Sequence, residues 1–357
     1  MKILVIAKLK SSQIKYKIQP LLNSDLVDEI IVLRKYDGPK IDKLKYIILP
    51  RLFKYRIFYV PFTPLFSIYY AKKLKVDLII SYHFVPHGFN AFLTHIATRI
   101  PYLYGQIDMD IERYCRNRLS KYFIKKIVDT SKYILVLGNR SKSFWTNMGF
   151  NENRIHIMPS SIDTETDFFP QRTGYLYDLL FIGTLDDNKR IISIMMAVQQ
   201  LVRNGDNIRF ALAGFGPLEG KVKLFIKENN LEENIVFLGE IDNILEIMNS
   251  SRLFIMASEF EGLPCALMEA MACEKIVLTT PAGDIPDIVK DGVTGFVLNN
   301  ADYLTIAERI KTVLNNFNNY AIIAKNARDI IIKDVSFRTT TQKWNKLLSE
   351  IKNENYH

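Results

Sequence analysis

Cysteine is scarce in this sequence, and long apolar runs are missing from it. The three cysteines among 357 residues form neither a Cys-x-x-Cys motif nor a cluster with histidine, which argues against a zinc site and a disulfide framework. No run of about 18 apolar residues occurs, so we predict no membrane-spanning helix. The apolar core at the N-terminus is too short for a signal peptide. We therefore expect a cytoplasmic protein with reduced thiols and no bound metal.

Acidic residues are the other deficit, and this deficit is confined to the first half of the chain. Residues 1–165 contain 27 Lys and Arg against 13 Asp and Glu, and the remainder contains 20 against 25, which gives the net charge of +9. Such an asymmetry indicates an anionic partner for the basic half. The sequence contains no zinc-finger or RNP motif, so we expect no nucleic-acid partner. A membrane surface is the better candidate.

One segment of the basic half combines aromatic residues with positive charge. Arg51–Lys75 has an aromatic core with basic residues at both ends. This is typical of an interfacial anchor, in which Arg and Lys meet anionic headgroups and the rings are buried beside them. A core segment with basic ends explains the same composition, because aromatic residues are common in cores. Pro61 and Pro64 are expected to break any long amphipathic helix here, and both interpretations stay open.

The remaining composition is that of a globular protein with more than one domain. The chain is 48% hydrophobic and 24% charged, and it is too long for one comfortable core. Short apolar runs at Ile3–Ala7, Glu29–Leu33 and Asp77–Ser81 alternate with helical or loop segments, which favours a parallel sheet. A second series of such runs begins at Asp178. We predict an α/β protein with two Rossmann-like, doubly wound parallel-sheet domains.

The stretch Glu259–Thr280 shows the strongest pattern for a ligand site. It lies between two predicted buried strands, and a helix is expected over Cys265–Ala272, with Pro264 at its first position. Glu261 then lies in the loop after a strand, and Glu269 lies on the helix. Free amides at the helix start, around Gly262, Leu263, Pro264 and Cys265, are suited to an anion. Surface acids on an ordinary helix are the alternative explanation for the two glutamates.

The Glu-x7-Glu spacing of Glu261 and Glu269, within Glu-Gly-Leu-Pro and Glu-Ala-Met-Ala, resembles a family motif. It is similar to that of the retaining, two-domain GT-B glycosyltransferases of family 4, also called group 1. The resemblance implies that Glu261 faces the donor sugar and that Glu269 holds the nucleotide ribose.

Further motifs of the second half follow the order of the same family. The resemblance implies that Lys189 and, in place of a usual glycine, Arg190 stabilise the donor diphosphate. Gly183 and Thr184 occupy the family's Gly-Arg turn, with threonine replacing the arginine. Gly214 and Gly216 resemble the glycines that let the backbone approach the nucleotide. The turn at 239–241 is expected to meet the nucleotide base.

The first half matches the family more loosely. His83 lies in a Tyr-His-Phe-Val-Pro-His loop that resembles the family's His-x-His loop, and Asp108 corresponds to the aspartate of its His-Gly-x-Asp loop. The resemblance implies that these two residues face the acceptor and the donor sugar. The family's Gly-Gly turn after the first strand is replaced by Lys8-Leu-Lys-Ser-Ser12, in which the two lysines would act electrostatically.

The same correspondence predicts the domain boundaries. An acceptor-side domain is expected over residues 1–165 and a nucleotide-sugar domain over residues 166–337, with residues 164–176 as the linker. A C-terminal helix within 338–357 is expected to return to the first domain.

The resemblance implies a retaining, metal-independent hexosyltransferase that uses a UDP- or GDP-type sugar and needs no cofactor. The expected acceptor is a glycan or a lipid-linked molecule in surface polysaccharide biosynthesis, with the enzyme cytoplasmic or peripheral on the inner face of the cell membrane. Two alternatives remain: a nucleotide-sugar epimerase of the same fold, and a non-catalytic partner subunit that binds nucleotide sugar.

Overall fold

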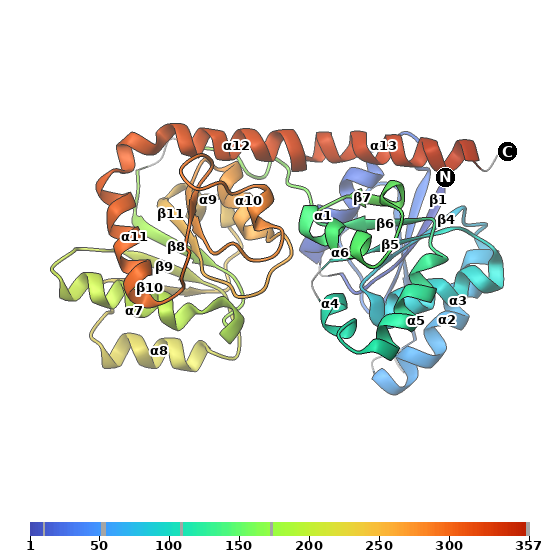
Figure 1. Ribbon diagram of the computed structural model, residues 1–357, viewed down its shortest axis with the longest axis horizontal. Helices are drawn as coiled ribbons and strands as arrows, with labels where there is room; N and C mark the ends of the chain where they lie inside the picture. The colour runs from blue at the N-terminus through green and yellow to red at the C-terminus, as the bar shows by residue number, and fades with distance from the viewer. Residues whose placement is uncertain (10, 51–54, 108–109, 172–173, 355–357) are drawn as a thin grey trace. The chain divides into compact units, whose positions relative to one another are not determined.

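The computed structural model describes the chain except for residues 10, 51–54, 108–109, 172–173 and 355–357 (Figure 1). The chain divides into two compact units. Unit 1 consists of Met1–Ser161 and Phe337–His357, and unit 2 consists of Ile162–Ser336. Each unit contains one parallel sheet with helices on both faces, as predicted from the alternating strand and helix patterns.

The described part of unit 1 contains a seven-stranded sheet in the order β3-β2-β1-β4-β5-β6-β7. The strands are β1 (Lys2–Ile6), β2 (Glu29–Arg34), β3 (Leu44–Ile48), β4 (Leu78–Tyr82), β5 (Tyr102–Gly105), β6 (Tyr133–Val136) and β7 (Ile155–Ile157). All neighbouring pairs are parallel. The chain leaves β1 toward one edge of the sheet and later returns to β4 on the other side of β1, so the strand order reverses between β1 and β4.

Alternate residues of β1 enter two separate cores, one on each face of the sheet. Ile3 and Val5 pack with α1 (Ser11–Leu22) and α13 (Phe337–Glu354). Leu4 and Ile6 pack on the opposite face. The helices of that second face are α2 (Arg56–Lys73), α3 (Phe89–Thr98), α5 (Arg118–Asp129) and α6 (Asn139–Asn147), with the short α4 (Asp110–Tyr114) before α5. The period-two burial follows from strand geometry, and it explains why these strands are almost wholly apolar.

The C-terminal helix α13 belongs to unit 1. Trp344, Leu347, Leu348 and Ile351 lie on one helical face and are buried in the core that α1 lines. Thr341 Oγ1 also donates a hydrogen bond to the Pro20 carbonyl in α1, at 2.9 Å. The last helix therefore closes one face of the unit 1 sheet, although it follows unit 2 in the sequence.

The expectation that two prolines would break the helix after Arg51 is wrong. Pro61 and Pro64 both lie inside α2, which continues to Lys73. A proline leaves the carbonyl four residues earlier without its helical donor. The hydroxyls of Thr63 and Ser67 donate to the carbonyls of Tyr59 and Thr63, which are not the carbonyls that the prolines leave without a donor. Tertiary packing of α2 against α3 supports the helix.

The described part of unit 2 contains a six-stranded parallel sheet in the order β10-β9-β8-β11-β12-β13. The strands are β8 (Tyr177–Ile182), β9 (Phe210–Ala213), β10 (Ile235–Gly239), β11 (Ser251–Met256), β12 (Ile276–Thr279) and β13 (Phe296–Val297). The helices are α7 (Ile191–Arg203), α8 (Glu219–Glu228), α9 (Ile244–Asn249), α10 (Cys265–Ala272), α11 (Tyr303–Asn315) and α12 (Ala321–Val335). Here the strand order reverses between β8 and β11.

Residues 164–171, predicted to be part of a linker, are held on unit 2. Arg328 of α12 donates to the carbonyls of Thr164 and Phe168, at 3.0 and 3.3 Å. The Gln171 amide donates to Asn249 Oδ1 at 2.8 Å, and Phe168 is buried. The polar composition therefore predicted irregular structure correctly, but tertiary hydrogen bonds fix this segment.

Candidate functional site

The predicted site residues of unit 2 gather at one edge of its sheet. In a doubly wound sheet, ligands bind beyond the carboxyl ends of the strands at the point where the strand order reverses. Here that point lies between β8 and β11. The loop after β8 carries Gly183–Arg190, and the loop after β11 carries Ala257–Pro264. The topology therefore brings together two segments that are about seventy residues apart in the sequence.

Lys189 and Glu261 form an ion pair across this point. Lys189 Nζ donates to Glu261 Oε1, and the two side chains are 15% and 12% exposed. A Cβ on Gly183 would lie 3.9 Å from Lys189 Cε, so the lysine side chain passes close over that glycine. Two opposite charges with so little water around them interact more strongly than a surface pair. The structure thus joins two of the predicted site residues, the lysine assigned to the diphosphate and the glutamate assigned to the donor sugar, through a contact that the sequence did not predict.

Asn188 fastens the two loops to each other. Its side-chain Nδ2 donates to the Phe260 carbonyl at 2.9 Å, and its Oδ1 accepts from the Phe260 amide at 2.9 Å. Its own carbonyl accepts from the Glu259 amide, also at 2.9 Å. One residue thus satisfies three backbone groups of the opposite loop and fixes the position of Glu261. Sequence analysis missed Asn188, because nothing in the local pattern distinguishes it from any polar turn residue.

Arg190 lies beside this pair and is partly exposed. Its Nη2 lies 3.4 Å from Glu259 Oε2, and its φ of 50° places it in the left-handed region. It precedes α7, where the family has a glycine; a left-handed backbone is the conformation that a glycine adopts without strain. Arg190 therefore keeps the backbone shape of the motif and adds a positive charge. Thr184, which stands for the family's arginine, is exposed on the same loop.

Gly214 and Gly216 let the loop after β9 approach the loop after β8. A Cβ on Gly214 would lie 1.8 Å from the Gly183 carbonyl oxygen, and one on Gly216 would lie 2.4 Å from the Leu185 carbonyl oxygen. Both distances are impossible for real atoms, so these positions need glycine for chain packing alone. This gives the two residues a structural reason beside the predicted nucleotide contact.

The helix α10 begins where it was expected, with one small difference. Pro264 is the N-cap residue, with extended backbone, and Cys265 is the first helical residue. The Pro264 carbonyl accepts from the Met268 amide at 3.2 Å, while Leu263 is buried beneath the turn. An extended proline can precede a helix because it has no amide that needs a partner. The helix start therefore lies directly after the loop that carries Glu261.

Gly283 supports this loop from below. Its φ is 56°, and a Cβ there would lie 1.8 Å from the Glu261 carbonyl oxygen. The adjacent Asp284 amide donates to the Gly262 carbonyl at 3.1 Å. The loop after β12 thus packs against residues 261–262 backbone to backbone, which leaves the Glu261 side chain little freedom to move.

Glu269 is not a surface acid. It lies on α10 and is 4% exposed, in a helix whose residues from Leu267 onward are all buried. Charged glutamates are rarely buried unless they have a structural or functional partner. The alternative explanation of the Glu pair as solvated helix acids is therefore wrong for Glu269, and Glu261 with its partly buried ion pair does not fit it either.

The predicted residues of unit 1 are only partly described. His83 follows β4, has a φ of 66°, and lies with His87 in the loop at the reversal of strand order in unit 1. The imidazole centroids of His83 and His87 are 6.2 Å apart. Asp108 lies outside the described residues, so its predicted place beside the site stays a prediction.

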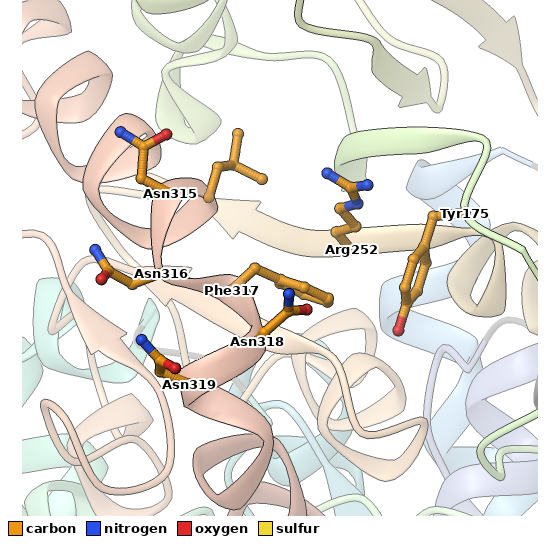
Figure 2. A pocket seen from close by; sticks show the side chains of 8 residues that line it. Tyr175, Arg252, Asn315, Asn316, Phe317, Asn318 and Asn319 are labelled. Carbon is orange, nitrogen blue, oxygen red and sulfur yellow. The ribbon is translucent and has the colours of Figure 1, made fainter.

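A separate pocket of about 380 Å³ lies at the opposite edge of the unit 2 sheet (Figure 2). Tyr175 precedes β8 and Arg252 is near the start of β11, so the pocket adjoins the amino ends of these strands. Figure 2 shows Tyr175 and Arg252 on one side and the segment Asn315–Asn319 on the other. This pocket is distinct from the Lys189–Glu261 site.

Residues 163–330 match the family model described as Glycosyl transferases group 1. The match covers nearly all of unit 2 and includes both loops that meet at the ion pair. Unit 2 is therefore similar to this family over nearly its whole length. The resemblance that was stated on the Glu-x7-Glu motif and its neighbours is thereby confirmed.

Two curated relatives share part of the chain. One, from Campylobacter jejuni, is named GalNAc-alpha-(1->4)-GalNAc-alpha-(1->3)-diNAcBac-PP-undecaprenol alpha-1,4-N-acetyl-D-galactosaminyltransferase; it is 28% identical over 49% of this chain and 48% of its own length. The chain thus spans about half the length of this relative. The other, from Staphylococcus aureus, is named capsular polysaccharide biosynthesis glycosyltransferase CapM and is 26% identical over 42% of this chain and 39% of its own length.

Solved structures share the fold of the whole chain. The crystal structure of Anabaena HepE in complex with UDP superposes with a TM-score of 0.79, covering 98% of this chain and 100% of that one at 17% identity. The predicted fold class, two Rossmann-like parallel-sheet domains of the GT-B type, is confirmed.

Proposed function

We propose that this protein is a retaining glycosyltransferase that moves a hexosyl group from a nucleoside diphosphate sugar to a glycan or lipid-linked acceptor in surface polysaccharide biosynthesis. The observation that carries the proposal is the largely but not fully buried Lys189–Glu261 pair at the reversal point of the unit that matches the group 1 family. The names of the Campylobacter and Staphylococcus relatives support the acceptor class and the polysaccharide setting.

The charges at this point suit a departing diphosphate. When the bond from the sugar to the diphosphate breaks, negative charge develops on the leaving oxygen, and a positioned cation lowers the energy of that state. Lys189 supplies this cation, and Arg190 supplies a second one on the next residue. The N-terminal end of α10, which begins at Cys265, adds the positive end of a helix dipole for the same oxygens. We assign these groups the role that a divalent metal has in other transferases.

Glu261 is suited to the sugar rather than to the phosphates. Its carboxylate would repel a diphosphate, but it accepts hydrogen bonds from sugar hydroxyls and stabilises positive charge on the ring. Departure of the diphosphate gives the ring oxocarbenium character, and an acceptor hydroxyl that arrives on the same face retains the anomeric configuration. In the ligand-free pair, Lys189 and Glu261 neutralise each other. When a donor binds, Lys189 contacts its phosphates and Glu261 contacts its sugar. Glu269 is assigned to the ribose.

The test of this proposal is a panel of UDP- and GDP-sugars. We expect one of them to raise the unfolding temperature, because binding to the folded state stabilises it by mass action. With a lipid-linked or glycan acceptor, the same donor should yield free nucleoside diphosphate and an extended product. Proton NMR of the product should show the donor's anomeric configuration. Conversion of the donor without acceptor would indicate an epimerase, binding without any turnover would indicate a silent subunit, and an inverted product would contradict the retaining mechanism.

A second part of the proposal concerns an anionic membrane surface. Within the part of the chain that the structure describes, no helix combines the length and apolarity needed to cross a membrane. The helices α2, α3 and α5 cover one face of the unit 1 sheet and lie side by side (Figure 1). Their outer surfaces carry large exposed apolar residues, which are Phe62, Leu65 and Tyr69 on α2, Phe89 and Ile96 on α3, and Leu119, Tyr122 and Phe123 on α5.

Basic residues accompany these apolar side chains. Lys73 Nζ lies 5.3 Å from the Tyr69 ring centroid, and Lys126 Nζ lies 5.1 Å from that of Tyr122. The sequence of α2 contains no acidic residue, and that of α5 contains only Asp129, at its end. Rings that enter the headgroup region beside lysines that meet anionic lipids are the pattern of an interfacial surface. We infer that this face rests on an anionic bilayer, where a lipid-linked acceptor would be found.

We predict that the protein sediments with vesicles that contain phosphatidylglycerol and not with pure phosphatidylcholine vesicles. The triple substitution Lys121→Gln, Lys125→Gln and Lys126→Gln should weaken this binding by at least about tenfold, because each lysine near an anionic surface contributes on the order of 1 kcal/mol. A matched triple on an exposed helix of unit 2, Lys221→Gln, Lys223→Gln and Lys227→Gln, should leave it unchanged. Equal loss in both triples would mean that net charge, and not this face, governs the binding.

A further inference from the structure

Unit 1 has a cluster of basic side chains at its own reversal of strand order. Lys8 follows β1, Lys35 follows β2, and His83 and His87 follow β4. These three strands are neighbours in the sheet, so their carboxyl ends meet at one edge. The topology therefore brings four basic residues from three separate loops to the place where a doubly wound sheet binds ligands.

The side chains form a continuous row through Tyr59 of α2. Lys35 Nζ lies 4.3 Å from the Tyr59 ring centroid, a distance at which a cation is attracted to the ring. The Tyr59 ring meets His87 edge-on, with centroids 6.0 Å apart. His87 in turn lies 6.2 Å from His83 between ring centroids. Lys35 is thus held by an aromatic partner rather than extended freely into solvent.

The electrostatics of the cluster are one-sided. His87 is 4% exposed; burial lowers its pKa to about 3, and the basic neighbours that add to the lowering are His83, Lys8 and Lys35. Burial also lowers the pKa of Lys35, and Lys8 adds to it. The charged neighbours that lower the pKa values of these two residues are basic. Lys8 and Lys35 thus repel each other, and a bound anion would offset that repulsion.

The backbone at His83 is also held in an uncommon conformation. Its φ of 66° is in the left-handed region, which a residue with a β-carbon adopts at a cost. Its amide donates to the Gly105 carbonyl at 3.2 Å, and its carbonyl accepts from the Gly88 amide at 3.0 Å. These two hydrogen bonds hold the backbone that presents the imidazole to the other members of the cluster. Strained residues of this kind concentrate at functional sites.

We propose that Lys8, Lys35, His83 and His87 bind an oxyanion, a phosphate or a carboxylate, that the acceptor carries close to its reacting hydroxyl. The inference rests on the proposed function in so far as the bound molecule is the acceptor of a transferase. The cations assigned to the donor diphosphate, Lys189 and Arg190, belong to unit 2. The cluster in unit 1 adds the cations Lys8 and Lys35, and the buried His87 beside them is a neutral imidazole that can donate a hydrogen bond, which suits a second anionic group.

The first experiment measures anion binding without any enzymatic activity. The chain has five histidines, so the imidazole signals of His83 and His87 can be assigned by substitution and followed by NMR during titration with inorganic phosphate at constant ionic strength. We expect both signals to shift with saturation. Lys35→Gln should weaken the affinity by about tenfold, as for the loss of one charge-assisted contact. Lys40→Gln removes one exposed lysine of the same unit and should change nothing.

The second experiment identifies the source of the anion. Three synthetic acceptors are compared that differ only in one substituent: a glycoside phosphate, a uronic acid glycoside and the neutral glycoside. We expect one charged acceptor to have a KM at least about tenfold below that of the neutral one, and Lys35→Gln to remove this advantage. The affinity of Lys35→Gln for the nucleoside diphosphate should equal that of the wild type.

Three results would overturn the inference. The first is that phosphate shifts neither imidazole signal, and the second is that Lys40→Gln weakens binding as much as Lys35→Gln. The third is that Lys35→Gln weakens nucleoside diphosphate binding, which would make the anion that of the donor. Failure of the wild type to bind any nucleotide sugar is a different outcome. It would refute the proposed transferase function while the histidine titration still decided whether the anion site exists.

Discussion

Replacing Glu261 with glutamine should lower kcat for sugar transfer by about 10²–10³, the loss usual when one preorganised electrostatic group is removed from an active site. The amide keeps the size of the side chain and can still hydrogen-bond, but it cannot stabilise positive charge on the sugar ring. The surrounding loop should keep its shape, because Asn188 and Gly283 fix it through backbone contacts. The measurement is turnover at saturating donor and acceptor.

The control for this prediction is an exposed ion pair in the same unit. Asp206 accepts from Lys311 at 2.8 Å on the surface, and neither residue lies near the reversal of strand order. Asp206→Asn should leave kcat within about twofold, since exposed pairs contribute little. If Glu261→Gln kept the wild-type kcat while its unfolding temperature was also unchanged, the carboxylate would have no part in the chemistry.

Replacing Lys189 with glutamine should have an effect of similar size for a different reason. The variant loses the cation that faces the developing charge of the leaving diphosphate, so kcat should fall by about 10²-fold or more. It also leaves the largely buried Glu261 carboxylate, which is 12% exposed, without its partner, and this is costly for stability. We therefore expect a lower unfolding temperature, measured by calorimetry, together with the loss of turnover.

The double variant Lys189→Gln with Glu261→Gln separates these two consequences. Removing both charges abolishes the unpaired carboxylate, so much of the lost stability should return while turnover stays low. Lys311→Gln, the partner half of the surface pair, should affect neither quantity. Full recovery of turnover in the double variant would contradict a catalytic role for the lysine.

Local patterns in the sequence predicted the strands and the helix α10 well. Strands in a parallel sheet are buried on both faces, and this burial explains continuous apolar runs such as Leu253–Ala257. Gly262 and Pro264 indicated where α10 begins, because their backbone preferences allow few alternatives. The position of Glu261 after one such strand and before this helix followed from the same local rules.

Contacts between distant segments were beyond local patterns. The pairing of Lys189 with Glu261 and the three hydrogen bonds of Asn188 span about seventy residues and depend on which strands are neighbours. The two prolines of α2 were misjudged for a related reason. Their cost is offset by the packing of α2 against α3, and the spacing of the prolines alone does not show this. The sequence predicted that Lys189 and Glu261 both lie in the site, but it did not predict that they form an ion pair.

The most direct test of the account is the affinity of two single variants for the nucleoside diphosphate without sugar, measured by titration calorimetry. Glu261→Gln should bind it as tightly as the wild type or more tightly, because a repelling carboxylate is gone and Lys189 is released from its partner. Lys189→Gln should bind it at least about tenfold more weakly. If both variants lost affinity to the same extent, or if Glu261→Gln lost more, the assignment of Lys189 to the phosphates and of Glu261 to the sugar would be wrong.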